Sequence, residues 1–339
     1  MDGIKVGLVG GSGFGAALAA QTEGRRHEIQ TPFGPPSDAI IESNWDGVPV
    51  FFVSRHGPGH ILHPSQVPYR ANIFALKQLG CTHVIASGAV GSLREEFRPR
   101  DLVVPEQVID KTHRRVGTFY DAAAVHTEFA EPFCPVLRQL ILETAKGLEE
   151  GPGRSAPERG GNSPTDNSAS TANLNPEPRT LNSFSVHDRG CYVCMEGPAF
   201  STRAESLMHR LWGGDLIGMT AMPEAKLARE AEMSYALVAL VTDYDCWRNQ
   251  PAAANAPQAE VNKQELLREI IGNLNAATEN AIRLIKRTVT LIAEKGGSLP
   301  PSPAHRALEL AIWSDKSRIP PEEVQRLAPL WIKYFGSSS

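Results

Sequence analysis

Residues 235–247 constrain the possible fold more than any other part of this 339-residue chain. The first seven of them, 235–241, form a nearly continuous apolar run, which predicts a strand buried on both faces of a parallel or mixed sheet. Thr242 follows the run, and two carboxylates, Asp243 and Asp245, come directly after it. Because side chains at positions i and i+2 of an extended chain share a face, we expect the two carboxylates to project together.

The position of this carboxylate pair points to a ligand site. Open α/β sheets bind their ligands at the carboxyl ends of their strands. Crowding of Asp243 and Asp245 raises the pKa of at least one of them, which leaves a proton available near neutral pH. Such a pair can accept from an exocyclic amine and protonate a neighbouring ring nitrogen, as cleavage of an aminopurine from its sugar requires. The same residues are also typical of an acidic loop that caps a helix or binds a cation.

Composition excludes several classes of protein. The length and the 41% of hydrophobic residues allow one large α/β domain with additions, or two domains. A formal net charge of -4 offers no general basic surface for nucleic acid. No apolar run approaches the roughly 20 residues that span a bilayer, and the first residues do not resemble a signal peptide. Five irregularly spaced cysteines indicate a reducing compartment, so we expect a cytoplasmic protein without membrane or nucleic-acid partners.

Two further predicted strands end in residues suited to anion binding. A strand at 4–9 is followed by a glycine-rich turn that carries Ser12. This turn lacks the following helix and the downstream acid of a dinucleotide fingerprint, so an anion loop or a plain glycine turn fits it better. A strand at 48–54 ends in Arg55 and His56, which can both donate to phosphate or carboxylate. The nearby histidines lack the spacing of zinc sites, and we expect no metal.

The remaining pattern alternates helices and strands over most of the chain. Residues 151–188 are rich in Gly, Pro, Ser, Asn and Thr, and predict a disordered or mobile excursion. A linker starting near residue 296 precedes two short helices at 305–313 and 321–334. Helices are predicted at 71–79, 135–150, 203–212, 223–230 and 262–293, and strands at 82–86, 101–104, 191–195 and 215–219. The strand at 82–86 leads to glycine-rich residues 87–92, and the strand at 215–219 leads to Thr220.

Seven longer words of sequence resemble the methylthioadenosine phosphorylase family of the trimeric purine nucleoside phosphorylase group. They are T-P-F-G-P-P-S-D at 31–38, S-R-H-G at 54–57, G-S-L-R-E-E at 91–96, A-E-P-F-C-P at 130–135, E-G-P-x-F-S-x-R-A-E at 196–205, G-M-T-x-M-P-E at 218–224 and T-D-Y-D-C-W at 242–247. The likeness covers about residues 4–150 and 189–290, in order and with natural spacing.

The resemblance implies an α/β fold, with a single-domain, three-layer phosphorylase/hydrolase-like architecture over residues 1–295. Its central mixed β-sheet is flanked by helices, and residues 296–339 form an extension. The implied reaction is phosphorolysis of 5'-methylthioadenosine to adenine and 5-methylthioribose 1-phosphate. Inorganic phosphate is the co-substrate, and neither a metal nor an organic cofactor takes part. The implied partners are the nucleoside and phosphate, in a homotrimer or a dimer of trimers.

The resemblance also implies roles for particular residues. Asp243 would act as the general acid at N7 of the leaving adenine, and Asp245 would accept from its 6-amino group. The implied phosphate ligands are Ser12, Arg55, His56, Thr220 and the backbone near Ala89. Met219 would lie against the ribose, Phe200 and Ser201 would border the base, and His126 and Val261 would shape a 5' pocket that a neighbouring subunit completes.

Some positions depart from the family pattern, and other functions stay open. Gly88 stands where threonine is common, Ala199 replaces an arginine, and Pro68 interrupts a V-N-Y word. Residues after Trp247 form a longer stretch, which bears on selectivity at the 5' position. The alternatives are a phosphorylase of the same fold acting on adenosine or methylthioinosine, a nucleosidase, a nicotinamide-dependent oxidoreductase and a nucleotide-binding protein without activity. A nucleosidase would need no anion site.

Overall fold

The strand predicted from the apolar run lies inside the sheet of the computed structural model, which describes residues 3–21, 23–149, 184–248 and 263–335. This strand, β11 (Ser234–Tyr244), belongs to an 11-stranded sheet, and its first nine residues are buried. It pairs in parallel with β5 (His83–Ser92) and antiparallel with β6 (Leu102–Val103). The sheet is therefore mixed, and the predicted α/β fold class is confirmed.

The main path of the sheet runs in the order β2-β3-β4-β1-β5-β10-β9-β7, with β11, β6 and β8 branching from β5. β1 pairs in parallel with both β4 and β5, so three strands deliver their carboxyl ends to one edge. The bounds of the other strands are β1 (Val6–Gly10), β2 (Arg25–His27), β3 (Ile40–Trp45), β4 (Val48–Ser54), β7 (Gln107–Asp110), β8 (Val186–His187), β9 (Cys191–Cys194) and β10 (Leu216–Gly218).

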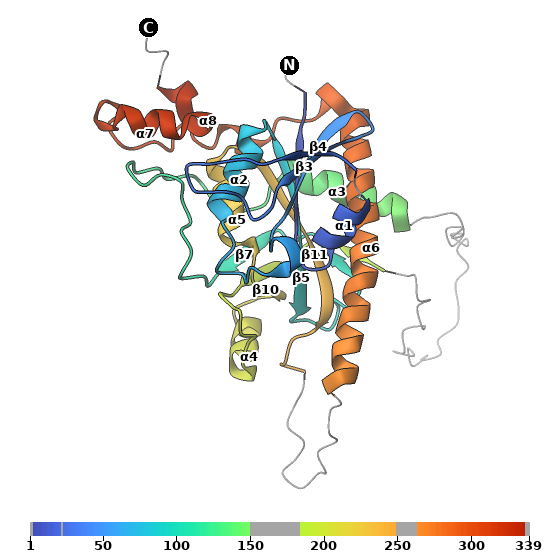
Figure 1. Cartoon of the computed structure of the whole chain (residues 1–339). Helices are drawn as coiled ribbons and strands as arrows, with labels where there is room; N and C mark the ends of the chain where they lie inside the picture. Colours follow the sequence, from blue (N-terminus) through green and yellow to red (C-terminus); the bar gives the residue numbers. More distant parts are fainter. Residues whose placement is uncertain (1–2, 22, 150–183, 249–262, 336–339) are drawn as a thin grey trace, which may run out of the picture.

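Helices cover both faces of the sheet and make three layers (Figure 1). On one side lie α1 (Phe14–Gln21), α3 (Pro135–Glu149) and the long α6 (Lys263–Lys295). On the other lie α2 (Tyr69–Gln78) and α5 (Ala221–Glu230), with α4 (Arg203–Leu211) beyond the end of the sheet.

The alternation of side chains along β11 explains why the strand is apolar at every position. Tyr235 and Leu237 belong to the hydrophobic core shared with α2 and α5. Ala236 and Val238 belong to a second core, shared with α1, α3 and α6. Successive side chains of a strand point to opposite faces, so a strand between two helical layers must be apolar on both.

Three expectations about local structure are wrong. A helix does follow the first glycine turn, because residues 14–21 are alanine-rich and α1 forms there. The glycine-rich residues 87–92 do not lie beyond their strand, since β5 continues to Ser92 in register with β11. Residues 184–188 are part of the fold, because β8 pairs with β6. The rest of the predicted excursion lies outside the described residues.

The C-terminal residues pack onto the body of the protein. The helix predicted at 321–334 is divided into α7 (Pro321–Arg326) and α8 (Ala328–Trp331), and the region predicted as a helix at 305–313 holds only a short 3-10 helix, Pro303–Arg306, followed by turns. Trp331 is fully buried, with its ring centroid 4.7 Å from that of Tyr120. The side chains that join the core of α2 and α5 are Leu308, Ala311, Ile319, Val324, Leu327, Leu330 and Trp331.

The described residues contain neither a membrane-spanning helix nor a metal-binding cluster. None of the helices is both long and apolar enough to cross a bilayer. No three side chains of the types His, Cys, Asp and Glu in these parts of the chain are placed to hold a metal ion together.

Candidate active site

Segments that lie far apart in the sequence come together at β5. They are the turn after β1, the residues after β4 and the residues after β10. The turn after β1 contacts β5 so closely that a Cβ on Gly11 would lie 2.7 Å from Arg55 Nη1 and 2.7 Å from the carbonyl oxygen of Ser87. A Cβ on Gly88 would lie 3.5 Å from the Thr220 hydroxyl. The glycines therefore let the ends of β1, β4, β5 and β10 meet, with Ser12 half-buried at their edge.

Arg55 lies beneath this meeting point, with its side chain fully buried. Its Nε and Nη2 donate to the two carboxylate oxygens of Glu224, each at 2.8 Å, and its Nη1 donates to Ser87 O at 2.7 Å. Tyr235 also donates to Glu224, at 2.9 Å. Burial alone would lower the pKa of Arg55, but the adjacent Glu224 carboxylate raises it above its ordinary value. The fork of Arg55 thus faces a carboxylate, one of the two kinds of anion expected for it, and this carboxylate belongs to Glu224 of the same chain.

His56 is a neutral, buried imidazole beside Arg55. Burial and then the charge of Arg55 lower the pKa of His56 to about 4, although its bond to Leu62 opposes this. The Leu62 carbonyl lies 2.8 Å from Nδ1 and can only accept, so Nδ1 carries the proton and Nε2 is left as an acceptor. The ring of His60 stacks on His56 at 4.2 Å. His56 therefore does not offer at Nε2 the second donor expected from the sequence, but Nε2 can accept a hydrogen bond from the hydroxyl of a monoprotonated phosphate.

Asp243 and Asp245 lie at the end of β11, after an irregularity in its pairing with β5. Val241 pairs with Val90 and Asp243 with Gly91, so Thr242 is the extra residue of a bulge. The Thr242 hydroxyl donates to Asp243 Oδ1 at 2.6 Å. Burial raises the pKa of Asp243, the Thr242 hydrogen bond opposes this, and the charge of Asp245 adds to the rise. The surroundings of Asp243 therefore favour its protonated form more than water does.

The turn before α4 brings Ser201 and Met219 toward the carboxylates. Cys246, which follows Asp245, lies with its Sγ 3.4 Å from Ser201 O. Gly197 has a φ of 66°, and a Cβ there would lie 2.5 Å from Met219 Sδ. Phe200 is 86% exposed, so its ring forms part of the outer surface.

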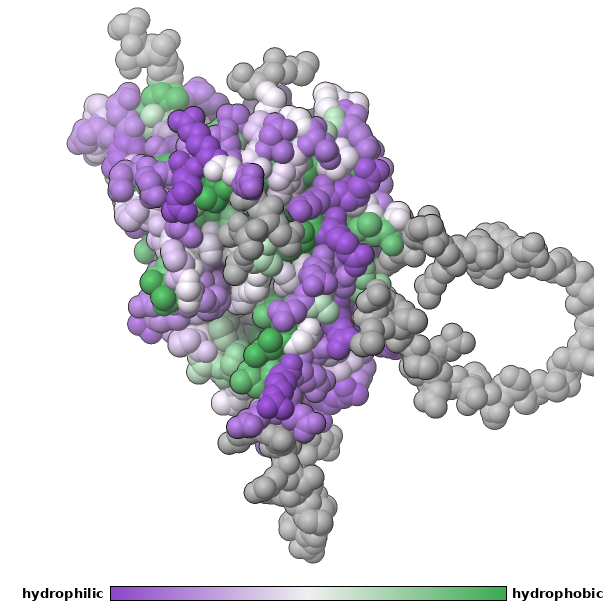
Figure 2. Space-filling model, turned by 45° about the vertical axis from the view of Figure 1, so that its right-hand side comes forward, coloured by the Kyte–Doolittle hydropathy of each residue, from purple (hydrophilic) through white to green (hydrophobic). Residues whose placement is uncertain are grey.

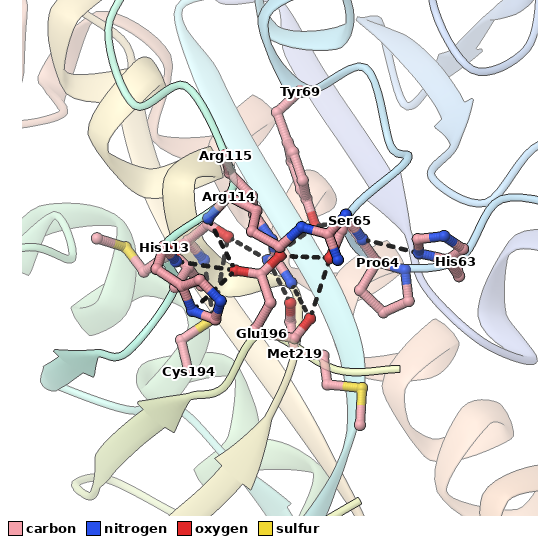
Figure 3. A network of polar contacts seen from close by, with 12 residues as sticks. His63, Pro64, Ser65, Tyr69, His113, Arg114, Arg115, Cys194, Glu196 and Met219 are labelled. Atoms are coloured by element: carbon pink, nitrogen blue, oxygen red, sulfur yellow. Dashed lines mark hydrogen bonds and ion pairs between the residues drawn. The ribbon is translucent and has the colours of Figure 1, made fainter. Parts of the chain in front are cut away.

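A network around Arg115 supports the same turn, and the sequence analysis missed it (Figure 3). Arg115 donates to the carbonyls of Met219, Met222 and Glu196 at 2.5, 2.6 and 2.6 Å. Burial would raise the pKa of Glu196, but the Ser65 hydroxyl, two backbone N–H groups and Arg115 lower it to about 2. The only sequence signal for this network was the glutamate of the E-G-P word, and nothing local marked Arg115 as its partner.

Other candidate residues lie elsewhere in the chain. Ala89 is half-buried in β5, where it pairs with Leu240 of β11. His126 is exposed on a loop that contacts the C-terminal residues: its backbone N–H donates to Ala311 O at 2.9 Å, and its ring lies 4.6 Å from that of Trp313. Val261 lies outside the described residues.

A cavity of about 270 Å³ adjoins the Arg115 network. Its walls include Ser65, Tyr69 and Arg115, but none of the residues expected to bind phosphate or base lines it. Pro68, one of the departures from the family pattern, is part of this wall. The cavity is therefore separate from the strand ends that carry Asp243 and Thr220.

Comparison with known proteins gives this arrangement a class. The model of the Phosphorylase superfamily matches residues 5–290, which include every strand described above. The chain therefore belongs to the Phosphorylase superfamily and has an α/β fold with a mixed sheet.

Similar proteins narrow the class further. An S-methyl-5'-thioadenosine phosphorylase of Thermosynechococcus vestitus is 41% identical over 98% of this chain and 99% of its own length. The structure of a methylthioadenosine phosphorylase from an antarctic soil metagenomic library has a TM-score of 0.75 and 38% identity, over 97% of this chain and 99% of that one. The methylthioadenosine phosphorylase of Schistosoma mansoni in complex with adenine has a TM-score of 0.68 and 31% identity, over 96% and 97% of the two chains. The chain belongs to the S-methyl-5'-thioadenosine phosphorylase family.

Proposed function

We propose that this chain catalyses the phosphorolysis of 5'-methylthioadenosine to adenine and 5-methylthioribose 1-phosphate. The observation that carries the proposal is the carboxylate pair at the end of β11, where burial and Asp245 raise the pKa of Asp243 beside the strand ends that bear Thr220 and Ser12. The names of the related enzymes and the adenine bound by the Schistosoma mansoni relative support the same substrate class.

On the base side, Asp243 activates the leaving group. The C1'–N9 bond breaks with its electron pair moving into the purine, and the proton of Asp243 meets that charge at N7. The raised pKa increases the fraction of Asp243 that carries this proton at a given pH. Asp245 accepts from the 6-amino group. A carboxylate only accepts, so it suits an amino group at this position, whereas an amide could also donate to a 6-oxo group. Ser201 and Phe200 border the base.

On the sugar side, phosphate supplies the nucleophile and needs no further cofactor. Ser12, the Thr220 hydroxyl, His56 Nε2 and the backbone at Ala89 bind the anion, and Met219 lies against the ribose. Arg55 lies beneath these groups and donates to Glu224. Gly11 has no side chain to separate the phosphate from the Arg55 guanidinium, so the guanidinium charge acts on the phosphate at short range. The phosphate oxygen then bonds to C1' as the purine leaves.

Exposed apolar side chains support an oligomeric assembly. Ile61, Leu310 and Trp313 are exposed by 74%, 89% and 71%, and are available to a partner subunit. Apolar surface also gathers toward the end of the molecule where α6 begins (Figure 2), at exposed Leu266 and Leu267. We propose a cytoplasmic homotrimer in which a neighbour's His126 loop covers the 5' end of the nucleoside and Val261 contributes to the same pocket.

The test is adenine release from 5'-methylthioadenosine with and without inorganic phosphate. Release that requires phosphate and is accompanied by one 5-methylthioribose 1-phosphate for each adenine supports the proposal. Phosphate-independent release identifies a nucleosidase and contradicts it. Adenosine and 5'-methylthioinosine in the same assay measure selectivity at the 5' and 6 positions, and faster turnover of either reassigns the preferred substrate.

A further inference from the structure

His209 of α4 is a buried histidine that the mechanism above does not use. His209 is 1% exposed, and its ring centroid lies 6.0 Å from that of Trp212. Lys111, just beyond β7, places its Nζ 2.9 Å from His209 Nε2 and 5.3 Å from the Trp212 ring centroid. A buried imidazole held by a lysine is an arrangement that packing alone does not require.

The lysine determines which ring nitrogen of His209 carries the proton. A lysine ammonium has donors and no acceptor, so Nε2 of His209 must accept from Lys111. Burial lowers the pKa of His209 and the charge of Lys111 lowers it further, which favours the neutral ring. In this neutral tautomer, Nδ1 is an N–H donor. That donor is buried and has no hydrogen-bond partner among the described residues.

A hydrogen-bond acceptor near His209 is also buried and also lacks a partner among the described residues. Asp245 Oδ2 is buried and likewise lacks a hydrogen-bond partner in the described parts of the chain. The negative charge of Asp245 opposes the lowering of the His209 pKa, which shows that the two groups interact electrostatically. Cys246 contacts Ser201 O, so the end of β11 and the start of α4 are packed together. A buried donor or acceptor without a partner destabilises the fold, so both groups call for a hydrogen-bond partner.

We propose that His209 is a positioning residue for purine recognition, whose Nδ1–H serves Asp245 directly or through one bridging water. A donor at Oδ2 leaves the other oxygen of Asp245 free to accept from a 6-amino group. Because a carboxylate only accepts hydrogen bonds, it offers no donor to a 6-oxo group. The inference rests on the proposed function, because it takes Asp245 as the ligand of the purine 6-substituent.

The other charged groups around this contact are consistent with that role. Asp243 shares the end of β11, and its Oδ1 already accepts from the Thr242 hydroxyl at 2.6 Å. Glu205, one turn before His209 on α4, is engaged by its cap residue Thr202. Lys111 reaches His209 from the other side of the ring. Asp245 is thus the acidic group for which the Nδ1–H donor is left.

The experiment measures dissociation constants for adenine and for hypoxanthine by calorimetry in the full-length protein. His209→Phe keeps the ring shape and removes the donor, so the preference for adenine over hypoxanthine should fall about 10-fold. His209→Asn should restore the preference, because its amide N–H occupies the place of Nδ1. His209→Gln should not, because its amide extends toward Lys111. Leu207→Ala, an exposed position on α4, is the control and should keep the wild-type ratio.

The outcomes separate this inference from the proposed function. An unchanged ratio in His209→Phe, an equal loss of affinity for both bases, or rescue by Gln rather than Asn overturns the role of His209. A wild-type protein that binds adenine but does not use phosphate contradicts only the proposed function, and the binding ratio still tests His209. Failure of the wild type to bind adenine overturns both.

Discussion

At the scale of single residues, the site depends on how differently the structure surrounds chemically identical groups. Asp243 and Asp245 are both aspartates at one strand end, yet Asp243 bonds to the Thr242 hydroxyl and has a raised pKa, whereas Asp245 Oδ2 is buried and has no hydrogen-bond partner among the described residues. Environments that separate two carboxylates in this way are how enzymes assign an acid and an acceptor. The division of labour between the two aspartates follows from their neighbours.

Asp243→Asn tests the acid role. The amide cannot supply a proton to N7, so kcat for 5'-methylthioadenosine should fall by about 100-fold or more. The raised pKa also predicts the pH profile: wild-type kcat should decline as pH rises through that pKa and the proton is lost, and the variant should lack this decline. Steady-state kinetics across pH measure both effects.

Binding of 5-methylthioribose 1-phosphate provides the control for this substitution. That product lacks the base, so its affinity should be unchanged in Asp243→Asn. A variant with near-normal kcat removes Asp243 from the acid role, and a variant that loses affinity for the sugar phosphate has a damaged site.

At the scale of elements, the candidate site depends on contacts between segments. The turn before α4 and the hydrogen bonds of Arg115 hold the strand ends in place. Arg115 holds the carbonyls of Met219 and Met222, which flank Thr220, and also the carbonyl of Glu196. The Thr202–Glu205 capping box starts α4 directly after Ser201. The segments that bear Met219 and Ser201 are therefore tied together through Arg115.

Gly197→Ala tests the contact between these two segments. A methyl group would lie 2.5 Å from Met219 Sδ and would force a side chain into a positive φ. The strain should lower stability by roughly 1–2 kcal/mol, and displacement of Met219 should raise KM for the nucleoside about 10-fold. Thermal unfolding and steady-state kinetics measure the two effects.

Gly213→Ala is the matched control for Gly197→Ala. Gly213 has a comparable φ of 85°, but its added methyl group would meet no atom within 4 Å. It should show the same loss of stability with an unchanged KM. Equal KM values for the two variants would mean that the contact with Met219 does not position the ribose.

At the scale of the whole molecule, the C-terminal residues belong to the core that supports the site. Trp331 is fully buried and packs near Tyr120, and Tyr334 donates to Glu232 at 2.5 Å. The superfamily model ends at residue 290, whereas the similarity to the Thermosynechococcus vestitus relative covers 98% of the chain. The extension is thus shared with that relative.

Trp331→Ala tests the contribution of the extension to stability. Removing a fully buried indole should lower the free energy of unfolding by about 3–5 kcal/mol. Arg318→Ala, in the same extension but at an exposed position, should change it by less than about 0.5 kcal/mol. Urea unfolding at one protein concentration measures both, and equally small effects would mean that the extension does not stabilise the core.

The sequence by itself determined the features that depend on local pattern. The apolar run of β11, the position of Asp243 and Asp245 at its end, the order of helices and strands and the capping box all follow from residues near one another in the chain. The family words at the strand ends added the reaction and the candidate ligands. Those roles stay predictions, as does Val261, which lies outside the described residues.

Tertiary structure alone decided which groups face one another. Arg55 pairs with Glu224, Arg115 with Glu196, and His209 with Lys111, and in each pair the partners come from different elements. The bulge at Thr242 and the burial of Trp331 likewise depend on neighbours brought in by packing. A side chain's accessibility and charge state are set by what surrounds it in space, and local sequence holds no record of partners that lie far along the chain.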